Sequence, residues 1–123
     1  MKLHGRWIAR FALLLLIGLL GSYHAVAQVN SAAIHGTVTD QSGAVIPNAT
    51  ITVLNTSTGI TTTATANSKG SFALTSLQPG GPYTVTISAS GFGSYQANNL
   101  TLNVNDDREV TGKLQIGPTA QTV

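Results

Sequence analysis

Past the N-terminal thirty or so residues, apolar and polar positions alternate along the chain with a period of two. In residues 34–39, IHGTVT, isoleucine, glycine and valine share one face, and histidine and the threonines share the other. This alternation is typical of a half-buried β-strand. It is cleanest in residues 83–89, YTVTISA, where Thr84, Thr86 and Ser88 form the polar face. The same pattern predicts further strands at residues 49–53, 60–66, 71–77, 95–104 and 110–116.

One of these segments changes phase part-way along. Tyr95 and Ala97 occupy odd positions, whereas the apolar residues that follow, up to Val104, occupy even positions. A bulge adds one residue to a strand and so shifts its phase by one. We therefore expect a bulge near Asn98–Asn99, with the apolar residues before and after it on a common face.

Turn residues separate the predicted strands. Asp40–Gly43 and Asn67–Gly70 each begin with a side chain that bonds the backbone two residues on, and each ends with glycine. Gln78–Pro82, QPGGP, is the strongest break and favours a type II turn. Asn105–Asp107 is expected to form a polar hairpin, and Gly117–Pro118 to end the last strand.

Together these elements predict an all-β protein, an antiparallel β-sandwich of about seven short strands, because no helical period follows the N-terminal segment. Each inward face contributes to one core between the two sheets. The predicted core consists of Ile34, Val38, Ile51, Val53, Phe72, Leu74, Val85, Ile87, Leu102, Val110 and Leu114. The last strand is also expected to direct Gly112 and Ile116 inward.

The first 27 residues have the three regions of a secretory signal peptide. A short basic start, MKLHGRWIAR, precedes an apolar run from Phe11 to Gly21 and a small-residue end, with cleavage expected between Ala27 and Gln28. A membrane anchor is the alternative, but the run falls short of the ~20 residues that cross a bilayer. The predicted division is therefore a signal peptide at residues 1–27, one domain at 28–117 and a tail or linker at 118–123.

Charge and cysteine content narrow the possible functions. The formal net charge is +2, but Lys2, Arg6 and Arg10 all lie in the leader. The rest of the chain is slightly acidic, which removes the basis for nucleic-acid binding. The chain has no cysteine. A disulfide framework, a thiolate metal site, a thiol nucleophile and a bacterial lipid anchor are therefore excluded.

The polar residues of the predicted domain do not form a catalytic set. His35 is its only histidine and faces outward by phase. A zinc site needs three or four converging ligands, and hydroxyls such as Ser68 and Ser71 have no histidine at a plausible position. We expect no catalytic, cofactor-binding or metal-binding residue, and no enzymatic activity of this domain by itself.

Asp106, Asp107 and Glu109 raise the question of calcium. An oxygen cage for calcium needs more ligands, usually on a loop with a turn glycine between them. A solvated hairpin tip is therefore the favoured interpretation of these carboxylates. Calcium binding near Asp106 and Asp107 stays open at this stage.

The order of elements resembles a carboxypeptidase regulatory-like domain. The matching stretches run in sequence from GTVTDQSGAVIPNATITV through NSKGSFAL, LQPG and YTVTISASGF to VTGKLQI, and so span the domain. The resemblance implies a transthyretin-like sandwich without a cofactor. Gly81-Pro82 departs from the family pattern as an insertion before Tyr83, and we expect it to lengthen that loop.

The family occurs in two relevant contexts. Beside a metallocarboxypeptidase it accompanies a zinc enzyme, for which this chain has no ligands. A signal peptide followed directly by such a domain is similar to the start of TonB-dependent, Oar-like outer-membrane receptors, where a plug and a β-barrel come next. The resemblance thus implies a periplasmic or outer-membrane location, and a protein partner there such as the receptor's own plug and barrel. It does not indicate the transported substrate or the oligomeric state.

The alternative is a free-standing secreted module that binds carbohydrate or acts as an adhesin. Phe92 and Tyr95 are the only possible aromatic platform, although the family position of Phe92 implies that it caps the sandwich. A Lys–Asn cross-link like that of some adhesins would need a lysine in the first strand, which has none. The triplets at Asn48, Asn55 and Asn99 are glycan acceptors only in a eukaryotic secretory route.

Overall fold

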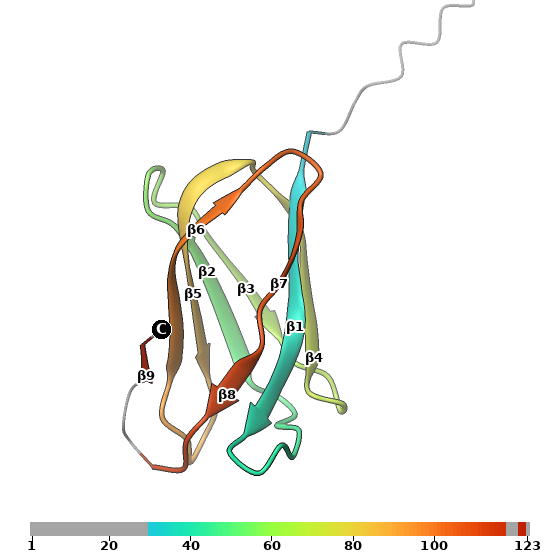
Figure 1. Ribbon diagram of the computed structural model, residues 1–123, viewed down its shortest axis with the longest axis vertical. Helices are drawn as coiled ribbons and strands as arrows, with labels where there is room; N and C mark the ends of the chain where they lie inside the picture. Colours follow the sequence, from blue (N-terminus) through green and yellow to red (C-terminus); the bar gives the residue numbers. More distant parts are fainter. Residues whose placement is uncertain (1–29, 118–120, 123) are drawn as a thin grey trace, which may run out of the picture.

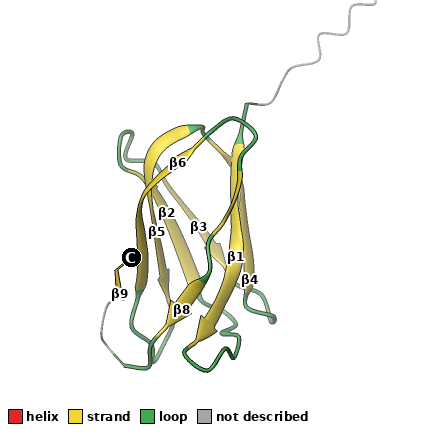
Figure 2. Ribbon diagram, in the orientation of Figure 1, coloured by secondary structure: helices red, strands yellow, loops and turns green. Residues whose placement is uncertain are grey.

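The structure is a computed structural model that describes residues 30–117 and 121–122. The described residues form strands and loops, with no helix among them (Figure 2). The described residues therefore include no helix that is long and apolar enough to cross a membrane. The predicted signal peptide, residues 1–27, and its cleavage after Ala27 lie outside the described residues.

Two sheets pack face to face as a β-sandwich, which confirms the predicted fold class (Figure 1). The β1 sheet has the order β4-β1-β7, with β8 also paired to β1. Its strands are β1 (Ala32–Asp40), β4 (Ser71–Leu77), β7 (Asp107–Glu109) and β8 (Gly112–Leu114). The β5 sheet has the order β3-β2-β5-β6-β9. Its strands are β2 (Thr50–Asn55), β3 (Thr61–Thr65), β5 (Gly80–Ser88), β6 (Tyr95–Leu102) and β9 (Gln121–Thr122).

The core fills the space between the sheets and confirms the predicted strand phases. Every residue of the predicted core is buried, and Ile34, Val85 and Ile87 are 0% exposed. Alternation along β1 and β5 places these side chains inward and the polar ones outward. Further buried residues complete this core, namely Ala32, Ile46, Ala49, Ala66, Leu77 and Tyr83.

Both predicted side-chain turns are present. In the first, Asp40 Oδ1 accepts hydrogen bonds from the Ser42 N–H at 2.8 Å and the Ala44 N–H at 3.0 Å. In the second, Asn67 Oδ1 accepts from the Lys69 N–H at 2.9 Å and the Ser71 N–H at 3.0 Å. A carboxylate and an amide oxygen thus hold the same turn at two places in the chain.

The predicted bulge in β6 is confirmed. Tyr83 pairs with Leu100 and Val85 with Ala97, so three steps along β6 match two along β5. At Asn99 the backbone takes a left-handed conformation, with φ at 59°, which accommodates the extra residue. Leu102 is thereby buried, but Val104, which lies beyond the strand, is 50% exposed and not inward as its parity predicted.

Two expectations about how the strands connect and pair were wrong. Asn105–Asp107 does not close a hairpin, because β6 and β7 lie in different sheets and β7 runs parallel to β1. The turn at Asn103–Asp106 instead carries the chain across the sandwich. The sandwich is therefore not purely antiparallel, since β8 also pairs parallel with β1 and β9 with β6. It also has more strands than the seven expected.

The insertion before Tyr83 does not lengthen a loop. Gly80–Pro82 already belong to β5, and Gly80 pairs with Leu102 of β6. The register shifts between Gly80 and Tyr83, where three steps along β5 match two along β6, so the inserted pair lies within the strand at a bulge. The break between β4 and β5 is therefore confined to Gln78 and Pro79.

The C-terminal end of the domain differs from its predicted phase. Val110 and Leu114 are buried as expected, but Ile116 is 82% exposed. Ile116 forms an isolated bridge with Phe92 beyond the last paired residue of β8. Within the segment expected as a tail, Gln121–Thr122 pair with Tyr95 and Gln96 as β9.

Candidate functional site

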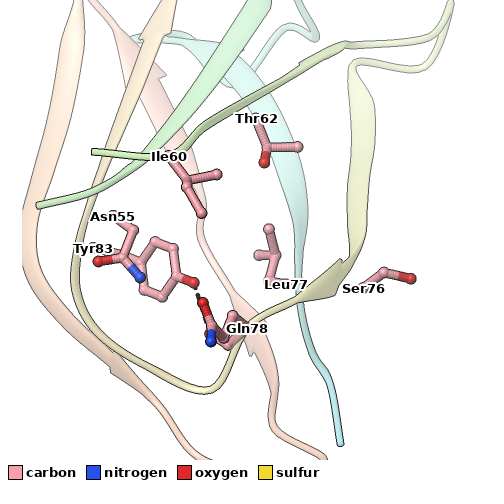
Figure 3. Close-up of a pocket in the computed structure, with 7 residues that line it drawn as sticks. All are labelled: Asn55, Ile60, Thr62, Ser76, Leu77, Gln78 and Tyr83. Carbon is pink, nitrogen blue, oxygen red and sulfur yellow. Dashed lines mark hydrogen bonds between the residues drawn. The ribbon is translucent and has the colours of Figure 1, made fainter. Parts of the chain in front are cut away.

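A pocket of about 170 Å³ opens at one side of the sandwich, between β3 and the end of β4 (Figure 3). Ile60 and Leu77 supply its aliphatic wall, and the ring of Tyr83 closes one side. The hydroxyl of Tyr83 donates a 2.6 Å hydrogen bond to the carbonyl oxygen of Gln78, which fixes the ring. The remaining lining residues are Asn55, Thr62, Ser76 and Gln78.

Asn55 is a buried polar side chain beside this pocket, only 4% exposed. Its Oδ1 accepts hydrogen bonds from the N–H groups of Ser57 at 3.0 Å and Thr58 at 3.3 Å. The amide thus stabilises the turn after β2, as Asn commonly does where it bonds the backbone two residues on. Because the side chain is buried, Asn55 is not presented as a glycan acceptor, whereas Asn48 and Asn99 lie at the surface.

The pocket contains no carboxylate, imidazole or amine. Its lining combines aliphatic side chains, amides and hydroxyls. Such a lining can hold an apolar side chain or a small neutral group, but general acid–base catalysis requires a group that titrates near the working pH. The lining is therefore suited to an apolar or small neutral occupant.

His35 lies on the outward face of β1, as predicted, but has a partner that was not predicted. Its Nδ1 lies 2.6 Å from Oδ1 of Asp107 on β7, and the two side chains are 43% and 68% exposed. The sequence showed the outward phase of His35. It did not show that β1 pairs parallel with β7. This pairing places Glu109 opposite His35, and Asp107 opposite Ala33, two residues before His35.

The carboxylates considered for calcium are occupied separately. Asp106 Oδ2 accepts hydrogen bonds from the backbone N–H and the side-chain amide of Asn103, at 2.7 and 3.0 Å. Asp107 contacts His35, and Glu109 is exposed on β7. Among the described residues no group of three or more His, Cys, Asp or Glu side chains is placed to hold a metal ion.

A shallow depression of about 350 Å³ lies beside these carboxylates, between the start of β1 and the end of β4. Ala32, Ala33 and Ser76 line it, with Asp106 and Asp107 at its rim. It is wide and open to solvent, so a bound molecule would keep much of its hydration there. It is a weaker binding site than the pocket at Tyr83.

The hydroxyls and aromatic rings singled out in the sequence are also placed. Ser71 pairs with Thr37 across the β1–β4 ladder, and the described hydrogen bond of the His35 ring goes to Asp107 rather than to a hydroxyl. Phe92 and Tyr95 are both half-buried against the core. Phe92 thus packs at the end of the sandwich, and the two rings do not form an exposed platform.

The outer face of the β5 sheet was not recognised in the sequence as a continuous surface. Cross-strand registers align Thr65, Thr50 and Ser88 in one row. They align Thr63, Thr52 and Thr86 in the next row. Threonine is the polar residue best suited to a pleated surface, so strand propensity alone explains much of this pattern. The result is an uncharged surface of hydroxyl groups.

Three solved structures with a similar fold come from differently named proteins. Hydroxyquinol 1,2-dioxygenase from Pseudomonas putida DLL-E4 matches with a TM-score of 0.58 at 10% identity, over 76% of this chain and 59% of that one. The Bacillus anthracis TIE protein matches with a TM-score of 0.57 at 15% identity, over 71% and 17%. A candidate carbohydrate-binding protein from Bacteroides uniformis ATCC 8492 matches with a TM-score of 0.55 at 19% identity, over 68% and 40%.

These likenesses concern the fold alone, and this chain spans less than two thirds of each of those proteins. No curated protein matches the sequence significantly. The sequence model of the carboxypeptidase regulatory-like domain matches residues 33–115, from the start of β1 to the end of β8. The chain therefore belongs to the carboxypeptidase regulatory-like domain family.

Proposed function

We propose that this chain is a non-catalytic, exported accessory domain that acts by contact, at the N-terminus of a TonB-dependent, Oar-like outer-membrane receptor. The single observation that carries the non-catalytic part is the dispersal of the titratable groups. His35 and Asp107 pair on one outer face, Asp106 holds a turn, and the pocket at Tyr83 has no carboxylate, imidazole or amine. Catalysis or metal binding requires such groups to converge.

The receptor context is supported by order along the chain. An N-terminal segment with the three regions of a signal peptide comes directly before the family domain, whose model begins at residue 33. This order resembles the start of TonB-dependent receptors. The partner in this proposal is a periplasmic chain, such as the plug and barrel of the same receptor, and an open sheet edge is a simple place for contact.

Three experiments test this proposal. Sequencing the gene beyond the codon for Val123 should reveal a plug and barrel, and their absence from the operon would overturn the receptor assignment. In an intact receptor, deletion of residues 34–116 should leave barrel insertion unchanged and alter uptake. Turnover of a peptide or glycan by the purified domain, abolished by one substitution, would overturn the non-catalytic assignment.

Export is tested separately. The exported protein should have an intact mass that begins at Gln28, because cleavage is expected after Ala27. Retention of Met1 in the exported form would contradict it.

The second candidate function is a free-standing, secreted carbohydrate-binding or adhesive module. The hydroxyl rows on the β5 sheet favour it, since hydroxyls can hydrogen-bond to sugars without any charge. Pull-down on insoluble polysaccharides should then show binding that falls in the Thr52→Val and Thr86→Val variants. Binding that is unchanged in both variants, or absent in the wild type, would exclude this surface.

A further inference from the structure

The described strands leave four sheet edges, and these are not protected equally. An edge strand presents unpaired N–H and C=O groups, and proteins usually guard it with charges, bulges, proline or a covering segment. The β7–β8 edge carries Asp107, Arg108, Glu109 and Lys113 and is interrupted at Val110 and Thr111. That edge is guarded by charge and by its break.

Two further edges are guarded by irregular backbone. The register between β1 and β4 shifts between Ala32 and Ile34, and Ser76 of β4 has φ at 60°. The edge of β6 is covered in part by β9 and has the bulge at Asn99. A partner strand would have to follow both distortions to pair continuously with either edge.

The β3 edge has no charge, proline or bulge, although β4 of the other sheet runs near it. Its sequence is TTTAT, without charge, proline or glycine. All five residues, Thr61–Thr65, pair with β2 in one continuous register. β3 is the outermost strand of the β5 sheet (Figure 1). Its second side is therefore a regular, uncharged strand edge.

The hydrogen-bond phase shows which groups this edge presents. The Asn55 N–H donates to the Ile60 carbonyl oxygen and the Ala66 N–H to that of Ala49, both at 2.9 Å. Bonded pairs alternate along an antiparallel ladder, so Thr62 and Ala64 direct their backbone groups toward β2. Thr61, Thr63 and Thr65 direct theirs away from it. Among the described residues no other hydrogen bond is made by these three threonines.

We propose that β3 pairs antiparallel with β3 of a second copy of this chain, with Thr63 opposite Thr63. In this register Thr61 of each copy lies opposite Thr65 of the other. All of the outward backbone donors and acceptors of Thr61, Thr63 and Thr65 then find partners across a two-fold axis. The β5 sheets of the two copies become one continuous sheet.

Two features of the edge favour a second copy over another protein. The outward-directed backbone groups of Thr61, Thr63 and Thr65 are spaced symmetrically about Thr63, as a two-fold contact requires. No like charges meet, because β3 has no charged residue. The inference goes beyond the proposed function, because it needs neither a receptor nor a periplasmic partner.

The association should be weak. Pairing of two five-residue strands buries less surface than the ~1,200 Å² of a stable protein–protein interface. We expect a dissociation constant on the order of 0.1–1 mM. Tethering in a membrane, or a high local concentration, would raise the dimer fraction.

The test compares substitutions at two exposed positions, Thr63 and Ser88, on the outer face of the β5 sheet. The full chain is produced by export, purified, and examined by sedimentation equilibrium up to millimolar concentration. Thr63→Lys places two like charges face to face and should weaken association by about 10-fold or more. Ser88→Lys, on the central strand β5, adds the same charge to the same face away from the edge and should associate like the wild type.

A charge-swap pair tests the register. Thr63→Glu alone should also be monomeric, and an equimolar mixture of Thr63→Lys and Thr63→Glu should associate again, because the opposite charges meet at the axis. Hydrogen exchange should show concentration-dependent protection at Thr61, Thr63 and Thr65 and none at Thr62 and Ala64. A wild type that stays monomeric at millimolar concentration, equal effects of Thr63→Lys and Ser88→Lys, or failure of the mixture to associate would overturn the proposal.

Discussion

The two sheets of this domain contribute similar inner faces to the core but have different outer faces. Both direct fully buried aliphatic residues inward, such as Ile34 on β1 and Ile87 on β5. The strands of the β1 sheet include His35, Asp107, Arg108 and Lys113, whereas the described strands of the β5 sheet include no charged residue. Both inner faces therefore meet the same requirement, which is to fold around one core. The outer faces differ in charge, and so they differ in the contacts that they can make.

The largest effect should come from the inner faces and should be similar for both sheets. Ile34→Ala and Ile87→Ala each remove a fully buried branched side chain and should each lower the free energy of unfolding by about 2–5 kcal/mol. Urea unfolding followed by far-UV circular dichroism measures both. A loss below ~0.5 kcal/mol for either variant would show that its sheet contributes less to the stability of the core than the other sheet does.

Two glycines of the β1 sheet should differ next, because Gly36 lies against backbone and Gly112 against a side chain of the β5 sheet. A Cβ on Gly36 of β1 would overlap the carbonyl oxygen of Val110, because the chain after β7 runs close against β1. Backbone cannot yield easily, so Gly36→Ala should destabilise by about 1–3 kcal/mol. Gly112→Ala is the control, since its Cβ would meet the flexible Cδ1 end of Ile87 at 2.5 Å, and it should cost less in the same unfolding assay. The reverse order would contradict this explanation.

The two equivalent turns should respond differently to acid. The Ser42 hydroxyl has the largest effect on the pKa of Asp40 and lowers it below the ordinary value of 3.8. Desolvation is next and opposes this shift, and the N–H groups of Ala44, Ser42 and Gly43 lower the pKa further. A depressed pKa stabilises the fold above the unfolded-state value, and that contribution disappears as the pH falls through the folded-state value. The turn at Asn67 has no titrating group.

Stability measured from pH 6 to pH 2 tests this difference. Asp40→Asn should reduce the acid-dependent loss of stability below about pH 4, because an amide keeps the acceptor without the titration. Asn67→Asp should add a new acid-dependent loss. Curves of Asp40→Asn and wild type that stay parallel through this range would mean that the turn at Asp40 makes no pH-dependent contribution.

The smallest effect should come from the exposed pair on the β1 sheet. A double-mutant cycle on His35 and Asp107 should give a coupling of about 0.2–1 kcal/mol, because both side chains are largely solvated. Added salt should reduce this coupling. The cross-strand pair Thr52 and Thr86 on the β5 sheet is the neutral control, and its coupling should not depend on salt. Equal salt dependence of the two pairs would remove the electrostatic contrast between the sheets.

Much of the fold could be predicted from the sequence because its information is local. The phase of each strand follows from alternation, and the bulge at Asn98–Asn99 follows from a single change of phase in that alternation. The turns at Asp40 and Asn67 follow from side chains that bond their own neighbours. These predictions depend on contacts between residues a few positions apart.

The errors concern which strands lie side by side. Alternation states which residues face inward but not in which sheet, so the segment at Asp107–Glu109 was predicted to continue a hairpin and instead joins β1. Ile116 has the parity of a core residue but lies past the end of β8. The candidate sites follow the same division, since the His35–Asp107 contact and the pocket at Tyr83 both join distant segments.

The parallel pairing of β1 with β7 has a consequence for the speed of folding. The contact between His35 and Asp107 spans 72 positions of the chain, and β1 lies between β4 and the final segments. Contacts of such long sequence separation form slowly, because loop-closure entropy must be overcome before they can stabilise the fold. A chain that emerges N-terminus first, from a ribosome or a translocation channel, therefore cannot complete its first strand's sheet until nearly the whole domain has emerged. Until then β1 lacks its partners β7 and β8, and that sheet stays incomplete.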